Sequence, residues 1–337
     1  MNRTDVRLDG APGLPAGREA VVGSAGRWRR RQRGERLMVP KAEFRSYYGL
    51  PVLNAPTWRA ADIAGYLFLG GLAGASSTLG AAAELAGRPR LAAGLKVGAA
   101  GALGGSLYAL IHDLGRPERF LNMLRVFKPS SPMSVGSWLL AGYGPLAGLA
   151  AGSQVTGLLP RLGRFGTAGA ALLGPAVAAY TAALIADTAV PTWHEAYREL
   201  PALFVGSAAA SAGGLGLLVA PAGEAGPARR AAVLGTAVEL VAARRMDRRL
   251  GLVAEPLREG AGGWLLRAGR AFGVGGAVLA VAGRRSRTAT ALAGAAFLAG
   301  AVCTRFGFFT AGVASAGDPK YTVAPQRERL GEKEAPR

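Results

Sequence analysis

Long apolar runs rich in glycine and alanine recur along this chain and restrict what it can fold into. An α-helix needs about 20 residues to cross a bilayer. Eight runs approach that length, at residues 62–83, 91–112, 135–157, 166–187, 200–220, 229–245, 263–283 and 288–311. Backbone polar groups in lipid must be bonded within the protein, so these runs predict helices rather than the shorter, alternating strands of a barrel. The sequence therefore predicts an all-α integral membrane protein, a bundle of about eight transmembrane helices.

The composition fits lipid surroundings better than water. Charged residues make up 18% of the chain, against about 25% in a typical soluble domain. Glycine accounts for 51 of 337 residues, and small residues allow helices in lipid to pack closely. A soluble protein with buried helices is disfavoured, because too few amphipathic faces are present to cover them. The run at 229–245 is the weakest, since Glu239 interrupts it and arginines frame it.

The formal net charge of +19 comes from residues placed in the breaks between the apolar runs. A nucleic-acid-binding protein would instead carry them along one face, so we expect topology signals and phospholipid contacts here, and no nucleic acid. The single cysteine, Cys303, excludes a disulfide within the chain. It also excludes a cysteine-ligated iron–sulfur cluster, which needs about four thiolates.

Three segments are expected: a basic arm at 1–45, the membrane domain at 46–312 and a polar tail at 313–337. Nine arginines precede Val39 and no apolar run follows them directly, so the arm is predicted to be disordered and not a secretory signal. Met38 offers a second possible start of the native protein. Eight helices place both termini on one side. The short loops hold eight basic residues on the side of the termini and nine on the opposite side. Because the loops are nearly balanced, the basic residues of the termini predict that both termini lie on the cytoplasmic side of the cytoplasmic membrane.

A polar, basic loop separates the second and third runs, from Ile111 to Trp138. Its sequence, IHDLGRPERFLNMLRVFKPSSPMSVGSW, puts ionisable groups at the mouth of the bundle, where they are costly and often functional. This loop resembles the one between the second and third helices of the NrfD/PsrC family of polysulfide-reductase-type membrane subunits. Further segments resemble motifs of that family in the same order. They are Tyr47–Pro51, Gly70–Gly74, Lys128–Ser134 and Ala186–His194.

The resemblance implies an NrfD/PsrC-like membrane anchor of a respiratory oxidoreductase. Such a subunit exchanges electrons between a non-covalently bound quinone, menaquinone or ubiquinone, and a ferredoxin-like iron–sulfur subunit. That partner connects in turn to a molybdopterin-type or similar catalytic subunit. The resemblance also implies that the chain itself carries no haem. Two bis-histidine haems would need about four axial ligands, whereas the chain has two histidines.

A quinone site needs hydrogen-bonding groups, a proton route and an apolar slot. Asp62 and Tyr66 share one face of the first helix, being four residues apart. The resemblance places this face in the quinone pocket, with Tyr66 as a hydrogen-bond donor and Asp62 as a proton donor or acceptor. A helix cap at the membrane surface is the alternative for Asp62.

The second helix ends in further candidates on the same side of the membrane. His112 can exchange protons near neutral pH, and Asp113 is a second candidate for proton transfer. Arg116 is a candidate quinone contact, or else pairs with Asp113 and fixes the loop.

The fourth helix carries Tyr180 and Asp187, and Trp193 and His194 follow as a possible lid over the pocket. The resemblance places a quinone-contacting tyrosine at Tyr180. An interfacial aromatic residue is the alternative for Tyr180, and a solvated histidine beside an interfacial tryptophan is the alternative for the lid. No metal site is predicted.

Two other functions stay open at this point. One is a proton-conducting or structural anchor that binds no quinone; Glu84, Glu239 and Arg305 would then form a proton path or a buried pair between helices. The other is a solute transporter. It would predict internal symmetry and broken helices around a midplane site, and neither is visible in the sequence.

Overall fold

The computed structural model describes residues 52–54, 56–114 and 116–334, and these are helical with no β-strand among them. The long helices are α2 (Ala60–Leu85), α3 (Pro89–Asp113), α4 (Pro132–Thr156), α5 (Pro160–Ala186), α7 (Leu200–Val219), α8 (Gly226–Arg249), α10 (Gly260–Ala282) and α11 (Arg287–Gly317). Shorter elements connect or follow them: η3 (Pro117–Leu124), α6 (Pro191–Glu195), η4 (Ala196–Arg198), η5 (Gly251–Ala254), α9 (Glu255–Arg258) and α12 (Lys320–Glu334).

Proline sets the beginnings of many of these helices. Five long helices, α3, α4, α5, α7 and α8, carry proline at the first or second position. There the missing N–H costs nothing and the fixed φ already suits a helix. Gly157 ends α4 with a φ of 71°, a left-handed conformation that glycine adopts without strain.

The all-α membrane class is confirmed, but the number of spanning helices differs from the predicted eight. Six helices in the described part of the chain are long and apolar enough to cross a membrane: α2, α3, α5, α7, α10 and α11. The two remaining long helices are α4 and α8. Glycine, serine, threonine and glutamine dilute the aliphatic residues of α4, and α8 has arginines at both of its ends. The sequence had marked the α8 run as weak, but not the α4 run.

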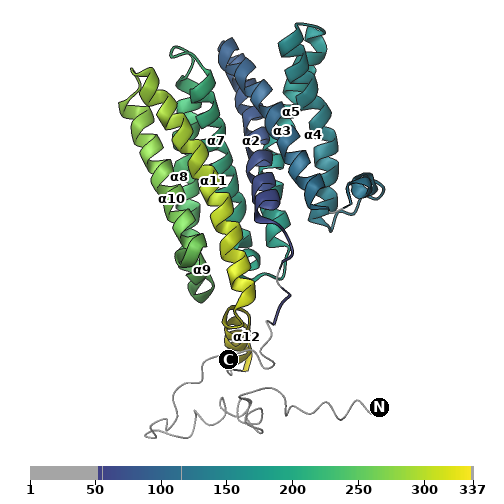
Figure 1. The fold of residues 1–337 in the computed structure, drawn as a ribbon, viewed down its shortest axis with the longest axis vertical. Coiled ribbons are helices and arrows are strands. Elements are labelled where there is room, and N and C mark those ends of the chain that lie inside the picture. Colours follow the sequence, from purple (N-terminus) through teal and green to yellow (C-terminus); the bar gives the residue numbers. More distant parts are fainter. Residues whose placement is uncertain (1–51, 55, 115, 335–337) are drawn as a thin grey trace, which may run out of the picture. The chain divides into compact units, whose positions relative to one another are not determined.

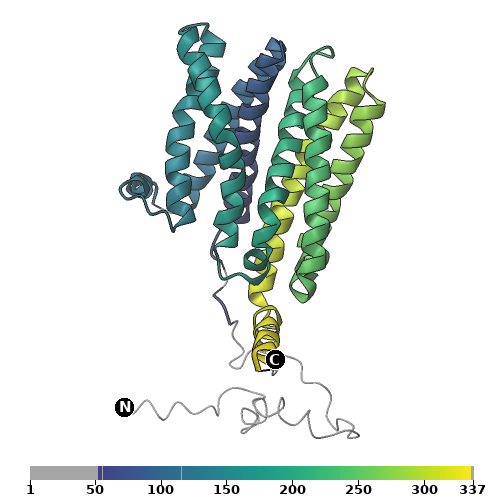
Figure 2. The same ribbon diagram turned by 180° about the vertical axis from the view of Figure 1, so that it is seen from behind.

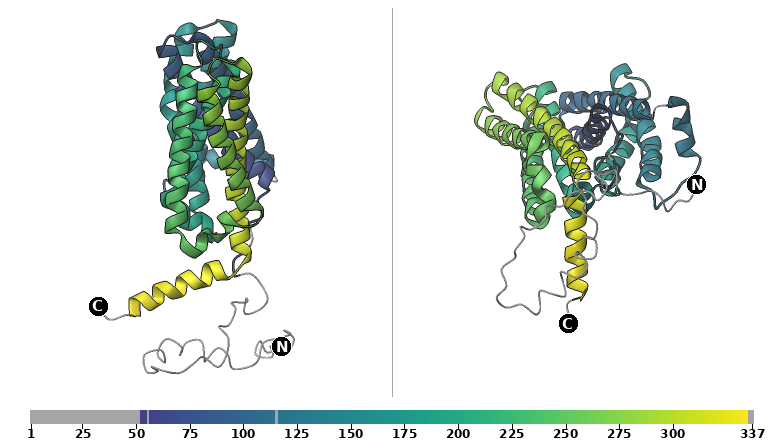
Figure 3. Two further views of the ribbon diagram at one scale, coloured as in Figure 1. Left: turned by 90° about the vertical axis from the view of Figure 1, so that its left-hand side faces the viewer. Right: turned by 60° about the horizontal axis from the view of Figure 1, so that its bottom comes forward.

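The long helices of residues 56–315 form two adjoining groups (Figures 1 and 2). One group contains α2, α3, α4 and α5, and the other contains α7, α8, α10 and α11. The two groups meet where α2 packs against α7. The long helices run alongside one another throughout (Figure 3), so successive connections lie at alternating ends of the bundle.

Glycines face one another where long helices cross most closely. A Cβ on Gly74 of α2 would overlap the carbonyl oxygen of Gly174 of α5, and the reverse also holds. At the α7–α8 crossing, a Cβ on Gly206 would lie 2.8 Å from the oxygen of Gly235. A third crossing, between α7 and α11, uses Gly214 and Gly294, where the corresponding distance is 2.8 Å. Packing in lipid depends on such close backbone approach, because water provides no hydrophobic driving force there.

A buried cation lies where the two groups meet. The Arg305 side chain of α11 is 1% exposed. Its Nη2 donates to the carbonyl of Phe204 at 2.8 Å, and its Nε donates to the carbonyl of Leu67 at 3.4 Å. Its guanidinium also covers the Phe204 ring, 3.7 Å from the ring centre. One side chain of α11 therefore holds α2 and α7 together.

The predicted division into segments is only partly covered by the described residues. The basic arm at 1–45 lies outside them, as does the Tyr47–Pro51 motif. At the other end, α11 continues to Gly317, and the tail that follows contains α12. Residues from Ala316 onward belong to a compact unit separate from that of the bundle.

The Gly74–Gly174 crossing provides a test of helix packing. Gly74→Ala should lower the free energy of unfolding by about 1–3 kcal/mol, the usual cost of overpacking, because the new methyl group meets backbone that cannot move aside. Gly65→Ala on the same helix is the matched control, since a Cβ there meets nothing within 4 Å. Alanine's higher helix propensity should leave this variant unchanged or slightly more stable. Thermal unfolding in detergent would measure both, and equal midpoints would contradict the proposed crossing.

Candidate functional site

The predicted site residues gather at one end of the bundle, the lower end in Figure 1, where α2 and α7 begin and α3 and α5 end. A pocket of about 580 Å³ opens there between the start of α4, the end of α5 and the α6–η4–α7 connection. It is lined by Pro129, Ser130, Pro132, Val135, Tyr180, Ala183, Ala186, Asp187, His194, Tyr197 and Pro201. Three predicted residues, Tyr180, Asp187 and His194, therefore share one pocket. Its size and mostly apolar walls are typical of small-molecule sites.

Tyr180 lines this pocket and carries a buried hydroxyl without a partner in the described structure. Its ring lies directly against Gly136 of α4, where any larger residue would overlap it. Its hydroxyl oxygen is buried and has no hydrogen-bond partner among the described residues. A buried polar atom without a partner is costly, and native proteins rarely leave one. A ligand oxygen in the pocket would remove that cost.

Tyr66 is buried behind Tyr180. It is 2% exposed and does not line the pocket. Its ring instead meets Tyr180 edge to face, with 6.5 Å between the ring centres. Tyr66 therefore supports Tyr180 from behind and is not part of the wall of this pocket.

His194 lines the pocket, and one of its ring nitrogens is bonded to the backbone. Its Nδ1 lies 3.2 Å from the carbonyl oxygen of Ala186. Since a carbonyl oxygen can only accept, Nδ1 carries the proton in this hydrogen bond. The other nitrogen, Nε2, is then an acceptor when the ring is neutral and a donor when it is protonated. Asp187 lies beside it at the exposed end of α5, in reach of water.

The short helix α6 is held rigidly, which fixes the position of His194. Thr192 donates through its backbone N–H to Ser315 Oγ at 3.3 Å and through its hydroxyl to the carbonyl of Val253 at 3.0 Å. Trp193 is 0% exposed, and its Nε1 donates to the carbonyl of Phe308 at 3.0 Å. The indole occupies the space that a side chain at Gly312 would need.

Trp193 therefore anchors α6 within the protein. Besides its hydrogen bond, its ring stacks on Trp58, with 5.9 Å between centres, and packs against Phe309 at 5.3 Å. It does not line the pocket. The side chain that faces the pocket from this motif is that of His194.

A hydrogen-bonded pair of side chains lies at the same end of the bundle, one helical turn from Tyr66. His112 Nδ1 and Asp62 Oδ2 are 3.0 Å apart, joining the end of α3 to the start of α2. The neighbouring Asp113 accepts a hydrogen bond from the backbone N–H of Arg59 at 3.4 Å. The predicted Asp113–Arg116 pair is not formed among the described residues. Arg116 is exposed and directly precedes η3.

Sequence reasoning missed Tyr197, which lines the pocket from η4. The guanidinium of Arg249 lies over its ring, 5.7 Å from the centre. Arg249 also donates to Glu199 at 2.6 Å, and this hydrogen bond lowers the pKa of the Glu199 carboxyl. The three residues come from η4, from the start of α7 and from the end of α8, so only the folded chain shows their association. No pattern in the sequence indicates that these three residues come together.

The remaining charged groups within the long helices do not meet this pocket. Glu84 pairs with buried Lys96 at 2.6 Å, where α2 ends and α3 begins. Glu239 accepts from the Thr304 hydroxyl at 2.6 Å, and no ion pair joins it to Arg305 within 4.0 Å in the described structure. Among the described residues, no group of three His, Cys, Asp or Glu side chains could hold a metal ion.

A comparison of the sequence with curated proteins gives no match. A comparison with protein families does. Residues 54–304 match the family described as "Polysulphide reductase, NrfD", which covers most of the chain and includes α2 through the pocket-forming loops to α11. The resemblance predicted from the 111–138 loop is thereby confirmed. The chain belongs to the NrfD family, the membrane subunits of polysulfide- and nitrite-reductase-type complexes.

Proposed function

We propose that this chain is the membrane anchor of a respiratory oxidoreductase and exchanges electrons and protons between a membrane quinone and an iron–sulfur partner subunit. The observation that carries the proposal is the pocket with the unpaired Tyr180 hydroxyl. Family membership supports the setting, a membrane subunit of such a complex. A bound quinone would supply chemistry involving two electrons and two protons.

The residues of the pocket suit a flat headgroup with an oxygen at each end. Tyr180 offers a hydroxyl donor, and His194 offers Nε2 on the wall formed by α6. Proline, valine and alanine side chains form the apolar slot between them. These groups bind and orient the headgroup, and they exclude water from its faces.

Protons would move through His194 and Asp187. Neutral His194 can take a proton at Nε2, and the protonated ring can return it, while Nδ1 stays bonded to Ala186. Asp187 can pass that proton to water, because it is exposed. The Asp62–His112 pair is a second proton-exchanging group at the same end. A proton-conducting role without quinone chemistry would leave the buried Tyr180 hydroxyl without a partner.

The partner subunits would dock at the bundle end that carries the pocket, since electrons must reach the headgroup over a short distance. We propose that this partner is a ferredoxin-like iron–sulfur subunit joined to a molybdopterin-type catalytic subunit. The basic residues of both termini favour the cytoplasmic side of the cytoplasmic membrane for this end.

Replacing two buried tyrosines separates binding from stability. Tyr180→Phe should weaken quinone binding about tenfold, the loss expected for one hydrogen bond. It should leave thermal stability in quinone-free detergent unchanged or raised, because an unpaired hydroxyl is removed. Tyr143→Phe should do the opposite. Its hydroxyl bonds Ser77 Oγ at 2.7 Å away from the pocket, so its loss costs about 1 kcal/mol and spares quinone affinity.

Quinone titration and thermal unfolding of both variants would provide the measurements. The proposal fails if Tyr180→Phe binds quinone as tightly as the native chain. It also fails if Tyr143→Phe loses affinity to the same degree, because the effect would then be one of general stability.

The two histidines should differ in their effects. His194→Gln keeps a polar side chain but cannot exchange a proton, so electron transfer between quinone and the co-purified partner should fall about a hundredfold, within the usual range for general acid–base groups. His112→Gln lies outside the pocket. It should therefore retain the native quinone content while slowing turnover more modestly.

Stopped-flow kinetics and extraction of bound quinone from the same preparations would separate these effects. Loss of quinone from His112→Gln would contradict the role assigned to His112. An unchanged rate of electron transfer in His194→Gln would contradict the role assigned to His194.

Purification of the native chain in mild detergent tests the proposal as a whole. Mass spectrometry should identify a co-purifying iron–sulfur subunit, and solvent extraction should yield menaquinone or ubiquinone in about equal amount to the chain. A chain that carries neither would leave family membership as a statement of fold alone.

A further inference from the structure

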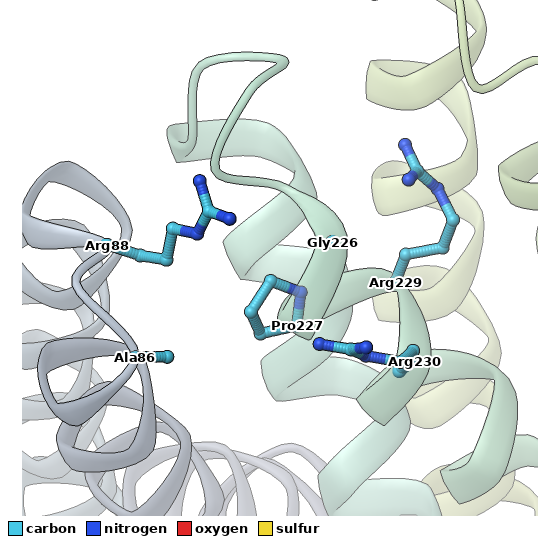
Figure 4. A pocket seen from close by; sticks show the side chains of 6 residues that line it. All are labelled: Ala86, Arg88, Gly226, Pro227, Arg229 and Arg230. Atoms are coloured by element: carbon cyan, nitrogen blue, oxygen red, sulfur yellow. The ribbon is translucent and has the colours of Figure 1, made fainter.

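A second pocket lies at the opposite end of the bundle and is surrounded by arginines. It has a volume of about 380 Å³, between the α2–α3 turn and the start of α8. Ala86, Arg88, Gly226, Pro227, Arg229 and Arg230 line it. In Figure 4, Arg88 and Arg230 extend into the space between the two segments, and Arg229 extends from the same turn of α8 away from Arg88. No residue of the proposed quinone site takes part.

The positive charge of this pocket is not neutralised by the described part of the protein. None of its three arginines forms an ion pair there. Arg88 donates from Nη1 to the carbonyl of Gly223 at 2.9 Å, and Nε of Arg229 is buried without a partner. Two carboxylates lie on the neighbouring segments, and neither forms an ion pair with these arginines. Glu224 accepts from the backbone N–H of Leu91 at 2.9 Å, and Glu84 pairs with Lys96.

The backbone adds to this positive field. No side chain caps the first turn of α8, whose second residue, Pro227, has no N–H to offer. Gly226 and Pro227 line the pocket, so the positive end of the α8 dipole lies beside it. Arg88 is itself the residue that precedes the first turn of α3. Guanidinium groups beside helix N-termini bind phosphate oxygens well.

The surface next to the pocket identifies the source of the phosphate. Along α8, Leu234, Val238 and Val241 follow Arg230 at spacings of four, eight and eleven residues, so all lie on one face of the helix. These three side chains are exposed, at 65%, 46% and 48%. A free phosphate ion has no apolar part that could contact these three side chains, whereas a lipid has an acyl chain that would lie along them.

We propose that this pocket binds an anionic phospholipid. Arg88 and Arg230 would hold the phosphate at the first turn of α8, and the acyl chain would cover the stripe from Leu234 to Val241. The lipid would join the α2–α3 turn to the start of α8, and so connect the two groups of helices. This site is independent of the proposed quinone chemistry.

The test uses the full chain, stripped of lipid in detergent and titrated with phosphatidylglycerol, phosphatidylcholine or inorganic phosphate. Native mass spectrometry would count bound lipid, and thermal unfolding would report stabilisation. Phosphatidylglycerol should bind more tightly than phosphatidylcholine. In Arg88→Gln/Arg230→Gln, its affinity should fall at least about tenfold, because two charge-assisted hydrogen-bonding groups are lost.

Arg161→Gln/Arg164→Gln is the matched control. These two exposed arginines lie at the start of α5, at the same end of the bundle but outside the pocket, and their replacement removes the same charge. The control should keep native affinity for phosphatidylglycerol. Arg230→Gln alone leaves the Arg88–Gly223 tether intact and guards against loss of folding.

Two results would overturn the proposal. Equal affinity of the pocket variant and the control for phosphatidylglycerol would show that binding follows total charge and not this pocket. Inorganic phosphate that binds as tightly as phosphatidylglycerol, and prevents its binding, would identify a site for the free anion. Leu234→Gln distinguishes the sources further, since it should weaken lipid binding and leave phosphate binding unchanged.

Discussion

The guanidinium of Arg305 lies where α2, α7 and α11 meet, and the geometry of the bundle depends on it. A cation buried in lipid surroundings is costly unless its hydrogen bonds are satisfied. Here the carbonyls of Leu67 and Phe204 accept from Nε and Nη2, and the Phe204 ring covers the planar group, while Nη1 has no partner among the described residues. Leu67 directly follows Tyr66, whose ring supports Tyr180. The contact between the two groups of helices is thus also what sets the depth of the proposed quinone site.

At that site, the residues that hold the backbone in place are not the residue that would exchange protons. The indole of Trp193 and the hydroxyl of Thr192 fix α6 from within the protein, while His194 on the same short helix faces the pocket. The side chain that would exchange protons therefore does not have to hold the backbone in place. This arrangement favours a preformed pocket over one that closes around its ligand.

The positions of the helices could be read from the sequence because lipid allows few alternatives. Each long apolar run became one helix, and prolines mark many of the beginnings. The α4 run was counted as a span because glycine, serine and threonine do not visibly interrupt an apolar pattern, although they dilute its aliphatic residues. In the site, Tyr180, Asp187 and His194 were predicted together because they follow one helix end. The roles of Trp193 and Tyr197 depend on Gly312 and Arg249, which are far away in the sequence. No local pattern reports such contacts.

The paired glycines have a consequence for how this bundle can evolve. Where a large side chain meets a small one, a change on one helix can be compensated by a smaller residue on the other. At Gly74 and Gly174, or Gly214 and Gly294, the partner of each Cα is already backbone, and no residue is smaller than glycine. A substitution at either position therefore has no second-site suppressor at its partner. These crossings should stay fixed, whereas helix positions where a Cβ meets open space, such as Gly65, can change freely.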